Sequence, residues 1–144
     1  MQTLRETGAG GAAPRSLTSL LNLPQVDPQK GKWGGQSAAN GFQLAATVKQ
    51  LVPDLGNQPA IHAVLLRVND TQRRSEFEGS DVTFHLHPTF NPDTVRIVAR
   101  NAEVLYSTRA WGAFTVGVEL FDGTKLELDL STPDTDAPDL FKTH

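Results

Sequence analysis

The sequence predicts an all-β fold in which antiparallel strands pack in two layers. Apolar and polar residues alternate in seven or eight short runs, and turn-forming residues separate these runs at short intervals. No segment carries the pattern of a long helix. At 144 residues the chain has room for one domain, since a small sandwich takes about 100 residues. Alternation alone does not distinguish a sandwich from a barrel.

Composition argues against several classes of function. The chain has 13 basic and 16 acidic residues, a formal charge of −3, and no cysteine. It therefore offers no broad attraction to nucleic acid or to an anionic membrane, and neither a disulfide framework nor a thiolate zinc site. It also lacks an apolar run long enough for a secretory signal or a membrane span. We expect a cytoplasmic protein without direct nucleic-acid or membrane partners.

Residues 1–30 are expected to form a flexible tail or linker. Glycine, alanine and proline dominate this stretch, and it has little that could form a buried face. One or two helical turns are possible over residues 16–23, with Leu17, Leu20 and Leu21 on one side. A short docking peptide for a partner is the alternative interpretation.

The predicted domain spans residues 31–132. Its strands are expected over 42–49, 60–68, 82–87, 95–100, 103–106, 115–120 and 125–130. Asp122-Gly123 favours a tight hairpin between the last two. Phe77 lies in a charged segment that we interpret as an edge strand or a loop, and Trp33 is expected to close one end of the core. Residues 133–144, rich in proline and aspartate, are expected to form a C-terminal tail.

The central strand ends in groups suited to bind a ligand. Val82, Phe84 and Leu86 alternate with polar residues, and Pro88 then ends the ladder because it has no amide proton to donate. His87, Thr89 and Phe90 supply an imidazole, a hydroxyl and an aromatic ring within four positions. We interpret this exit as one side of a candidate site.

A second stretch, Trp111-Gly112-Ala113-Phe114, follows some twenty residues later and leads into another alternating strand. The order of Leu-His-Pro-Thr-Phe and then Trp-Gly-Ala-Phe resembles the paired signature of the YEATS domain, particularly its prokaryotic branch. The resemblance covers about residues 31–132. It implies an immunoglobulin-like β-sandwich that acts as a non-enzymatic reader of acylated lysine.

The resemblance also implies a set of site residues. Trp111 and Phe90 would sandwich the acyl group, and Phe114 and His87 would close the pocket. The alternative is that the three aromatic side chains simply fill the sandwich core.

Polar contacts to the acyl amide are implied as well. Thr89 stands where the family usually has serine, and its hydroxyl would contact the amide with help from backbone groups near Trp111 and Gly112. Thr89 brings a stiffer side chain than serine. Ala110 replaces a frequent glycine, so a positive φ would be disfavoured there.

Other functions fit less well. His85 and His87 form a His-X-His pair of the kind used in metal sites, but no glutamate follows closely, and His62 and His144 are the only other histidines. Neither a nucleophile elbow nor a phosphate-binding loop occurs. We expect no cofactor and no metal. The alternative to acyl-lysine reading is a sensor or interaction domain of a prokaryotic signalling or defence system, linked to an effector protein and binding a different ligand.

Overall fold

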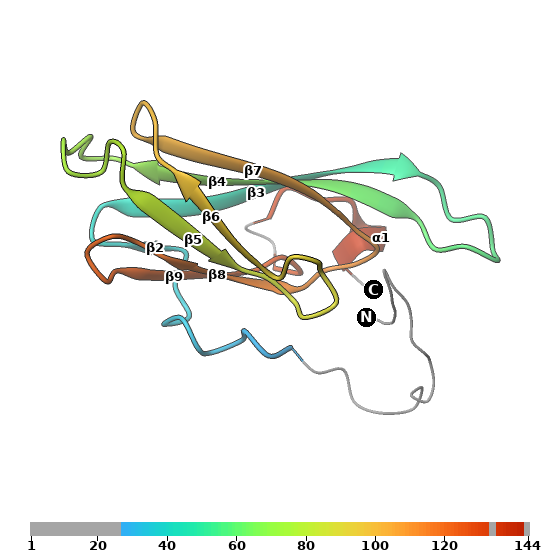
Figure 1. Cartoon of the computed structure of the whole chain (residues 1–144). Helices are drawn as coiled ribbons and strands as arrows, with labels where there is room; N and C mark the ends of the chain where they lie inside the picture. Colours follow the sequence, from blue (N-terminus) through green and yellow to red (C-terminus); the bar gives the residue numbers. More distant parts are fainter. Residues whose placement is uncertain (1–26, 133–134, 143–144) are drawn as a thin grey trace.

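Two four-stranded antiparallel sheets pack face to face in the computed structural model, which describes residues 27–132 and 135–142 (Figure 1). The first sheet has the order β2-β3-β4-β7 and the second the order β6-β5-β8-β9. The eight strands and their two-layer arrangement confirm the predicted immunoglobulin-like β-sandwich. Their bounds are β2 Ala38–Ala39, β3 Phe42–Val52, β4 Ile61–Asp70, β5 Asp81–His85, β6 Thr94–Val98, β7 Glu103–Ala110, β8 Thr115–Glu119 and β9 Lys125–Asp129.

Alternation along the strands builds the core between the sheets. Each strand of an antiparallel sandwich points every second side chain inward, so the apolar members of the alternating runs meet across about 10 Å. The first sheet contributes Phe42, Val64 and Leu66, and the second contributes Phe84 and Val118, all fully buried. Phe77 is also fully buried although it lies in turns rather than in an edge strand.

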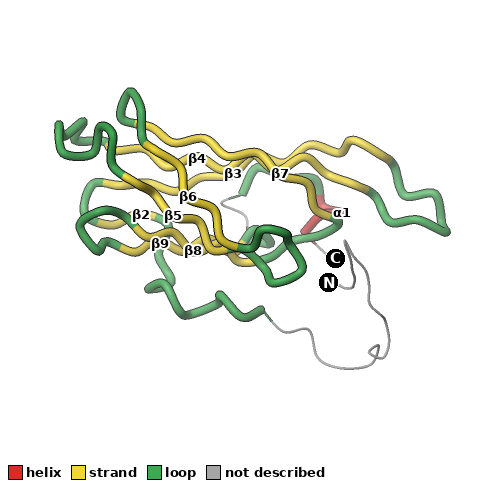
Figure 2. Tube along the Cα trace, in the orientation of Figure 1, coloured by secondary structure: helices red, strands yellow, loops and turns green. Residues whose placement is uncertain are grey.

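The register places the two loops that carry the motifs at one end of the sandwich. We call these loops, residues 86–93 after β5 and 111–114 before β8, the motif loops. Val52 of β3 pairs with Ile61, His62 of β4 pairs with Ala110 at the end of β7, and β8 begins five residues later. In the second sheet, β5 pairs with β8 through His85 and Gly117. The loops after β5 and before β8 therefore leave neighbouring strands of one sheet (Figure 2).

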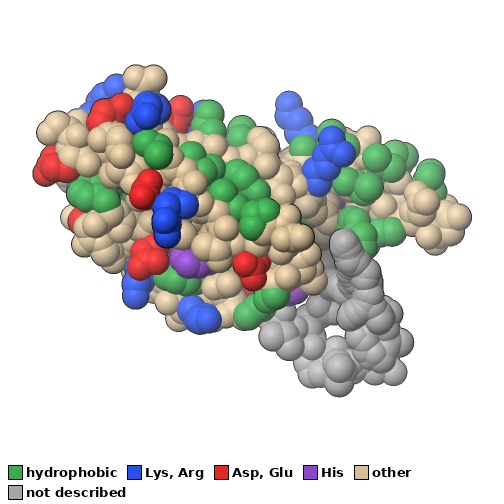
Figure 3. Space-filling model, in the orientation of Figure 1, with side chains coloured by type: hydrophobic (Ala, Val, Ile, Leu, Met, Phe, Trp, Pro, Cys, Tyr) green, Lys and Arg blue, Asp and Glu red, His purple; other side chains and the backbone are tan. Residues whose placement is uncertain are grey.

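The hairpin between β3 and β4 projects beyond the sheets at the same end (Figure 1). Leu51 and Leu55 are exposed on it, at 49% and 62%, and hydrophobic side chains are visible on this projection in Figure 3.

Residues 27–35, which we call the strap, lie along the outer face of the second sheet. The Glu127 carboxylate accepts hydrogen bonds from the backbone amides of Gly31 (2.8 Å), Trp33 (2.9 Å) and Gly35 (3.3 Å). The Trp33 ring lies over Gly117, where an added Cβ would stand 2.2 Å from the indole Cδ1. Trp33 thus covers the outside of a sheet, and the expectation that it closes an end of the core is wrong.

The C-terminal segment also joins the sandwich. Asp136 forms a parallel bridge with Thr47 of β3, and Phe141, in the short helix α1 (Asp139–Lys142), is fully buried against His62. The described residues on both sides of the predicted 31–132 domain therefore pack on it, and we propose that residues 27–30 and 135–142 belong to the folded unit. The leucines at positions 17, 20 and 21 lie outside the described residues. Among the described residues, no helix is long and apolar enough to cross a bilayer.

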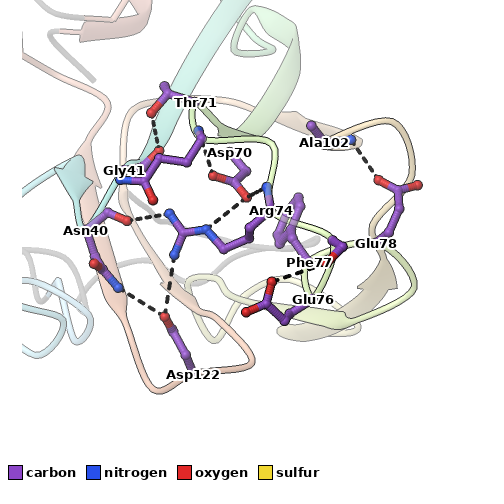
Figure 4. Close-up of polar contacts among 12 residues, drawn as sticks. Asn40, Gly41, Asp70, Thr71, Arg74, Glu76, Phe77, Glu78, Ala102 and Asp122 are labelled. Carbon is purple, nitrogen blue, oxygen red and sulfur yellow. Dashed lines mark hydrogen bonds and ion pairs between the residues drawn. The ribbon is translucent and has the colours of Figure 1, made fainter.

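Arg74 links the two sheets at the end opposite the motif loops (Figure 4). Its Nε lies 3.0 Å from the buried Asp70 carboxylate, its Nη2 donates to the carbonyl of Asn40 at 2.7 Å, and its guanidinium lies 4.2 Å above the Phe42 ring. Asp122, in the β8–β9 hairpin, approaches Nη1 at 3.9 Å. One guanidinium thus holds a carboxylate, a carbonyl and an aromatic face.

Glu78 stabilises a tight turn nearby. Asn101 and Ala102 have φ values of 58° and 62°, in the left-handed region that costs energy for alanine. The Glu78 carboxylate accepts the Asn101 amide at 2.8 Å and the Ala102 amide at 2.9 Å. The contact with Ala102 is drawn in Figure 4. The hydrogen bond from Ala102, followed by that from Asn101, lowers the pKa of Glu78 below its ordinary value.

Candidate functional site

His87 and Thr89 are in contact at the exit of β5. The Thr89 amide donates to His87 Nδ1 at 3.2 Å, and the Thr89 hydroxyl lies 2.9 Å from the same nitrogen. The contact depends on a turn rather than on strand alternation, because the Phe90 amide returns to the His87 carbonyl at 3.0 Å. Pro88 occupies the second position of this turn, where its fixed φ is favoured.

The contact with the Thr89 amide favours one tautomer of His87. A backbone N–H can only donate, so Nδ1 must be an acceptor and the ring proton of the neutral imidazole must sit on Nε2. The Thr89 hydroxyl then donates to Nδ1 as well. Its oxygen keeps lone pairs directed away from the ring, and Thr89 is exposed. A hydroxyl held in this way is oriented to accept a hydrogen bond from an incoming N–H group.

Phe90 and Phe114 bring the two loops together. Their ring centroids are 4.8 Å apart with planes inclined by 48°, within the range of favourable aromatic pairs. Phe114 is buried and belongs to the hydrophobic core, whereas Phe90 is half-buried and packs against it. Phe114 is therefore a core residue that also supports the Phe90 ring.

Trp111 and Gly112 are half-buried in the loop that follows β7. Ala110 is the last residue of β7 and pairs with His62 in the ladder, so alanine is compatible with the extended backbone at this position. The loop is held at its far end, where Ala113 donates its amide to the Phe141 carbonyl at 3.1 Å and Leu130 donates to the Phe114 carbonyl at 3.0 Å.

The two histidines of the His-X-His pair have separate surroundings. His85 lies on the outer face of β5, where its ring stacks on Trp33 and its Nε2 is 3.4 Å from Glu119. His87 lies beyond the strand in the turn with Thr89. Within residues 27–132 and 135–142, no group of three or more His, Cys, Asp or Glu side chains is arranged to hold a metal ion.

Three residues near these loops escaped the sequence analysis. Asp27 accepts a hydrogen bond from the Thr115 hydroxyl at 2.5 Å, and Gln29 donates to the Leu86 carbonyl at 3.0 Å. Phe141 supplies the carbonyl that holds Ala113. All three lie in proline-rich stretches without alternation, and their only signal was a single aromatic or polar side chain in an otherwise featureless segment.

Comparison with known families supports the resemblance drawn from the two motifs. Residues 63–131 match the family model of the prokaryotic YEATS domain. YEATS domains are reader modules rather than enzymes. No curated protein matches the chain significantly.

Solved structures similar to this chain include yeast Yaf9, described as a homologue of AF-9, at 18% identity and a TM-score of 0.42, covering 61% of this chain and 62% of that one. The Yaf9 YEATS domain recognizing an H3K122suc peptide has 18% identity and a TM-score of 0.40, covering 61% of this chain and 71% of that one. The same domain bound to H3K27ac has 18% identity and a TM-score of 0.40, with 61% and 70% coverage. This chain thus spans about 62% of the first structure. The family resemblance predicted from the two motifs is confirmed: the segment 63–131, which contains both, is similar to prokaryotic YEATS domains.

Proposed function

We propose that this protein is a non-enzymatic module that binds an acylated lysine side chain of a protein or peptide. The observation that carries the proposal is the contact between His87 Nδ1 and the Thr89 hydroxyl at 2.9 Å, next to the Phe90 and Phe114 rings. An acyl-lysine needs a hydrogen-bond acceptor for its amide N–H, a donor for its carbonyl, and an apolar surface for its tail. The two motif loops offer all three.

The tautomer with Nδ1 as acceptor determines which group of the ligand amide would bond to Thr89. Because the Thr89 hydroxyl donates to Nδ1, its oxygen would accept the ligand amide N–H. The ligand carbonyl would then need a backbone donor from the other loop. Ala113 already donates to Phe141, so the amides of Trp111 and Gly112 remain the candidates for this role.

The aromatic side chains would hold the acyl tail. Phe90 is half-buried on the Phe114 ring, and Trp111 is half-buried on the second loop. A flat or short apolar group between Phe90 and Trp111 would bury surface on both of its faces. Acetylation or crotonylation removes the positive charge of lysine, so these groups would be held without an ion pair.

Thr89→Val provides the sharpest test. The substitution keeps the shape and removes the hydroxyl, so the ligand amide loses its acceptor at a typical cost of about 1–3 kcal/mol, or roughly 5- to 150-fold in affinity. Isothermal titration with acetyl-lysine and crotonyl-lysine peptides would measure it, with the unmodified lysine peptide as a blank. Thr89→Ser should retain most of the affinity.

Thr83→Val is the matched control. Thr83 is a half-buried threonine of β5 that pairs with Arg96 and Glu119, away from both loops, and its loss should leave binding unchanged. Normal binding by Thr89→Val would refute the acyl-amide mechanism. Absence of binding by the wild-type protein to every acyl-lysine peptide would favour a sensor or interaction domain that recognises another ligand.

A further inference from the structure

We propose that Asp27 and Gln29, in the strap ahead of the family-matched segment, are positioning residues that hold the two motif loops in their binding geometry. This inference rests on the proposed function for its consequence in binding. Its structural content concerns the loops themselves and can be measured without a ligand.

Each strap residue is bonded to the chain at or beside one end of a motif loop. Gln29 donates its side-chain amide to the Leu86 carbonyl at 3.0 Å, one residue before His87. The Asp27 carboxylate accepts the Thr115 hydroxyl at 2.5 Å and approaches the Thr115 amide at 3.4 Å, one residue after Phe114. Two residues of one short segment therefore secure the start of one loop and the end of the other.

These bonds are sheltered from competing water. Thr115 is fully buried, and Asp27 and Gln29 are half-buried. A hydrogen bond to a carboxylate is stronger than one between neutral groups, and partial burial strengthens it further. The Gln29 amide is fixed at both ends, because its oxygen also accepts the Trp33 indole N–H at 2.8 Å. Its orientation toward Leu86 is thereby set.

The strap itself is anchored by contacts that do not involve the loops. The Glu127 carboxylate holds three strap amides, Trp33 stacks on His85, and Gly117 leaves the space that the indole occupies. Glu127 is a buried acid on β9, a position where a carboxylate is costly unless such donors satisfy it. Residues of β5, β8 and β9 thus fix the strap on the sheet, and this holds Asp27 and Gln29 in place.

Each loop also has backbone hydrogen bonds of its own. The first is closed by the bond from the Phe90 amide to His87, and the second by the bond from the Ala113 amide to Phe141. Neither bond involves a strap residue. The hydrogen-exchange rates of the Phe90 and Ala113 amides therefore report how well each loop is held, and a change caused by a strap substitution shows that the strap positions that loop.

Three variants separate positioning from general stability. Gln29→Met keeps the length of the side chain and removes both hydrogen bonds, and Asp27→Ala removes the carboxylate from Thr115. Lys32→Met is the matched control, because Lys32 lies on the same strap with an exposed side chain, and the substitution leaves the strap backbone unchanged.

The experiment measures amide hydrogen exchange of the full chain without ligand. Gln29→Met should accelerate exchange of the Phe90 amide, and Asp27→Ala that of the Ala113 amide, each by about 5- to 20-fold, while the Val118 amide in the core keeps its wild-type rate. Lys32→Met should change neither loop amide. The same two variants should weaken acetyl-lysine peptide binding by about 5- to 20-fold, with a conserved melting temperature.

Two results would overturn the proposal: unchanged loop amides in both variants, or acceleration of loop and core amides together, which would indicate a general structural role. If the wild-type protein binds no acyl-lysine peptide, the proposed function fails, and the exchange rates still decide whether Asp27 and Gln29 position the loops.

Discussion

The indole of Trp33 lies nearly parallel to the imidazole of His85, with ring centroids 4.1 Å apart and planes inclined by 16°. This stack joins a residue outside the family-matched segment to the strand that leads into the first motif loop. Lys125 adds its ammonium group 5.8 Å from the centroid of the Trp33 ring. Trp33 therefore packs against the outer face of the second sheet around His85 and Gly117.

Gly117→Ala should destabilise the protein by about 1–3 kcal/mol, because the new methyl group would occupy the position of the Trp33 ring and force the strap away. Chemical denaturation would measure the change. Trp33→Ala removes the indole ring that the new methyl group would meet. Gly117→Ala should therefore destabilise the Trp33→Ala variant much less than it destabilises the wild-type protein. Additive effects of the two substitutions would contradict the contact.

Trp111→Ala and Phe114→Ala should separate a ligand contact from a core contact. Phe114 is buried in the hydrophobic cluster, so its truncation should cost about 3–5 kcal/mol. Trp111 is half-buried on a loop, and its truncation should leave the melting temperature within a few degrees while removing acyl-lysine binding. Thermal unfolding and peptide titration together check this. Loss of folding in Trp111→Ala would place its side chain in the core.

Arg74→Met should destabilise the fold by about 3–5 kcal/mol, since the Asp70 side chain is fully buried and would lose its counter-charge. Arg67→Met is the control. Arg67 forms an equally short ion pair with Glu103, but its side chain is 55% exposed, so its removal should cost at most about 1 kcal/mol. Equal effects in urea denaturation would show that the Arg74 network adds nothing beyond a surface pair.

The ionised Glu78 carboxylate should stabilise the folded protein, and this contribution should disappear at acidic pH. Because its pKa is lowered in the folded state from 4.5, the contribution is fully present above that value and is lost as pH falls through the lower folded pKa. Glu78→Gln should therefore reduce the melting temperature at pH 7, and the difference from wild type should shrink below pH 4.5. A difference that stays constant with pH would exclude the carboxylate as its source.

The alternating runs allowed the sandwich to be predicted, because each strand has one face toward the core and the other outward. The 115–120 run illustrates this, with Val116 and Val118 fully buried between the sheets. The extent of β7 was underestimated: the sequence predicted 103–106, and the strand reaches Ala110. Its polar end could still form a ladder because β4 supplies a partner for every residue from Glu103 to Ala110.

The strap and the C-terminal segment could not be found from periodicity. Their contacts are single side chains that reach distant parts of the chain, as when Gly31 meets Glu127, and no local pattern records such pairs. His87 and Thr89 are two residues apart, so strand alternation alone would point both side chains to one side of the sheet. The structure produces their contact through the turn at Pro88, which brings the Phe90 amide to the His87 carbonyl.

The bridge between Thr47 and Asp136 has a consequence for how the molecule resists aggregation. β2 covers only the beginning of the outer edge of β3, and from Ala46 to Val48 the C-terminal segment takes over, with Val48 donating to Asp136 and Asp136 donating to Ala46. A chain that ended at residue 132 would leave these backbone groups open to a strand of another molecule. Intermolecular pairing at β3 is thus blocked by residues that look, in the sequence, like a dispensable end.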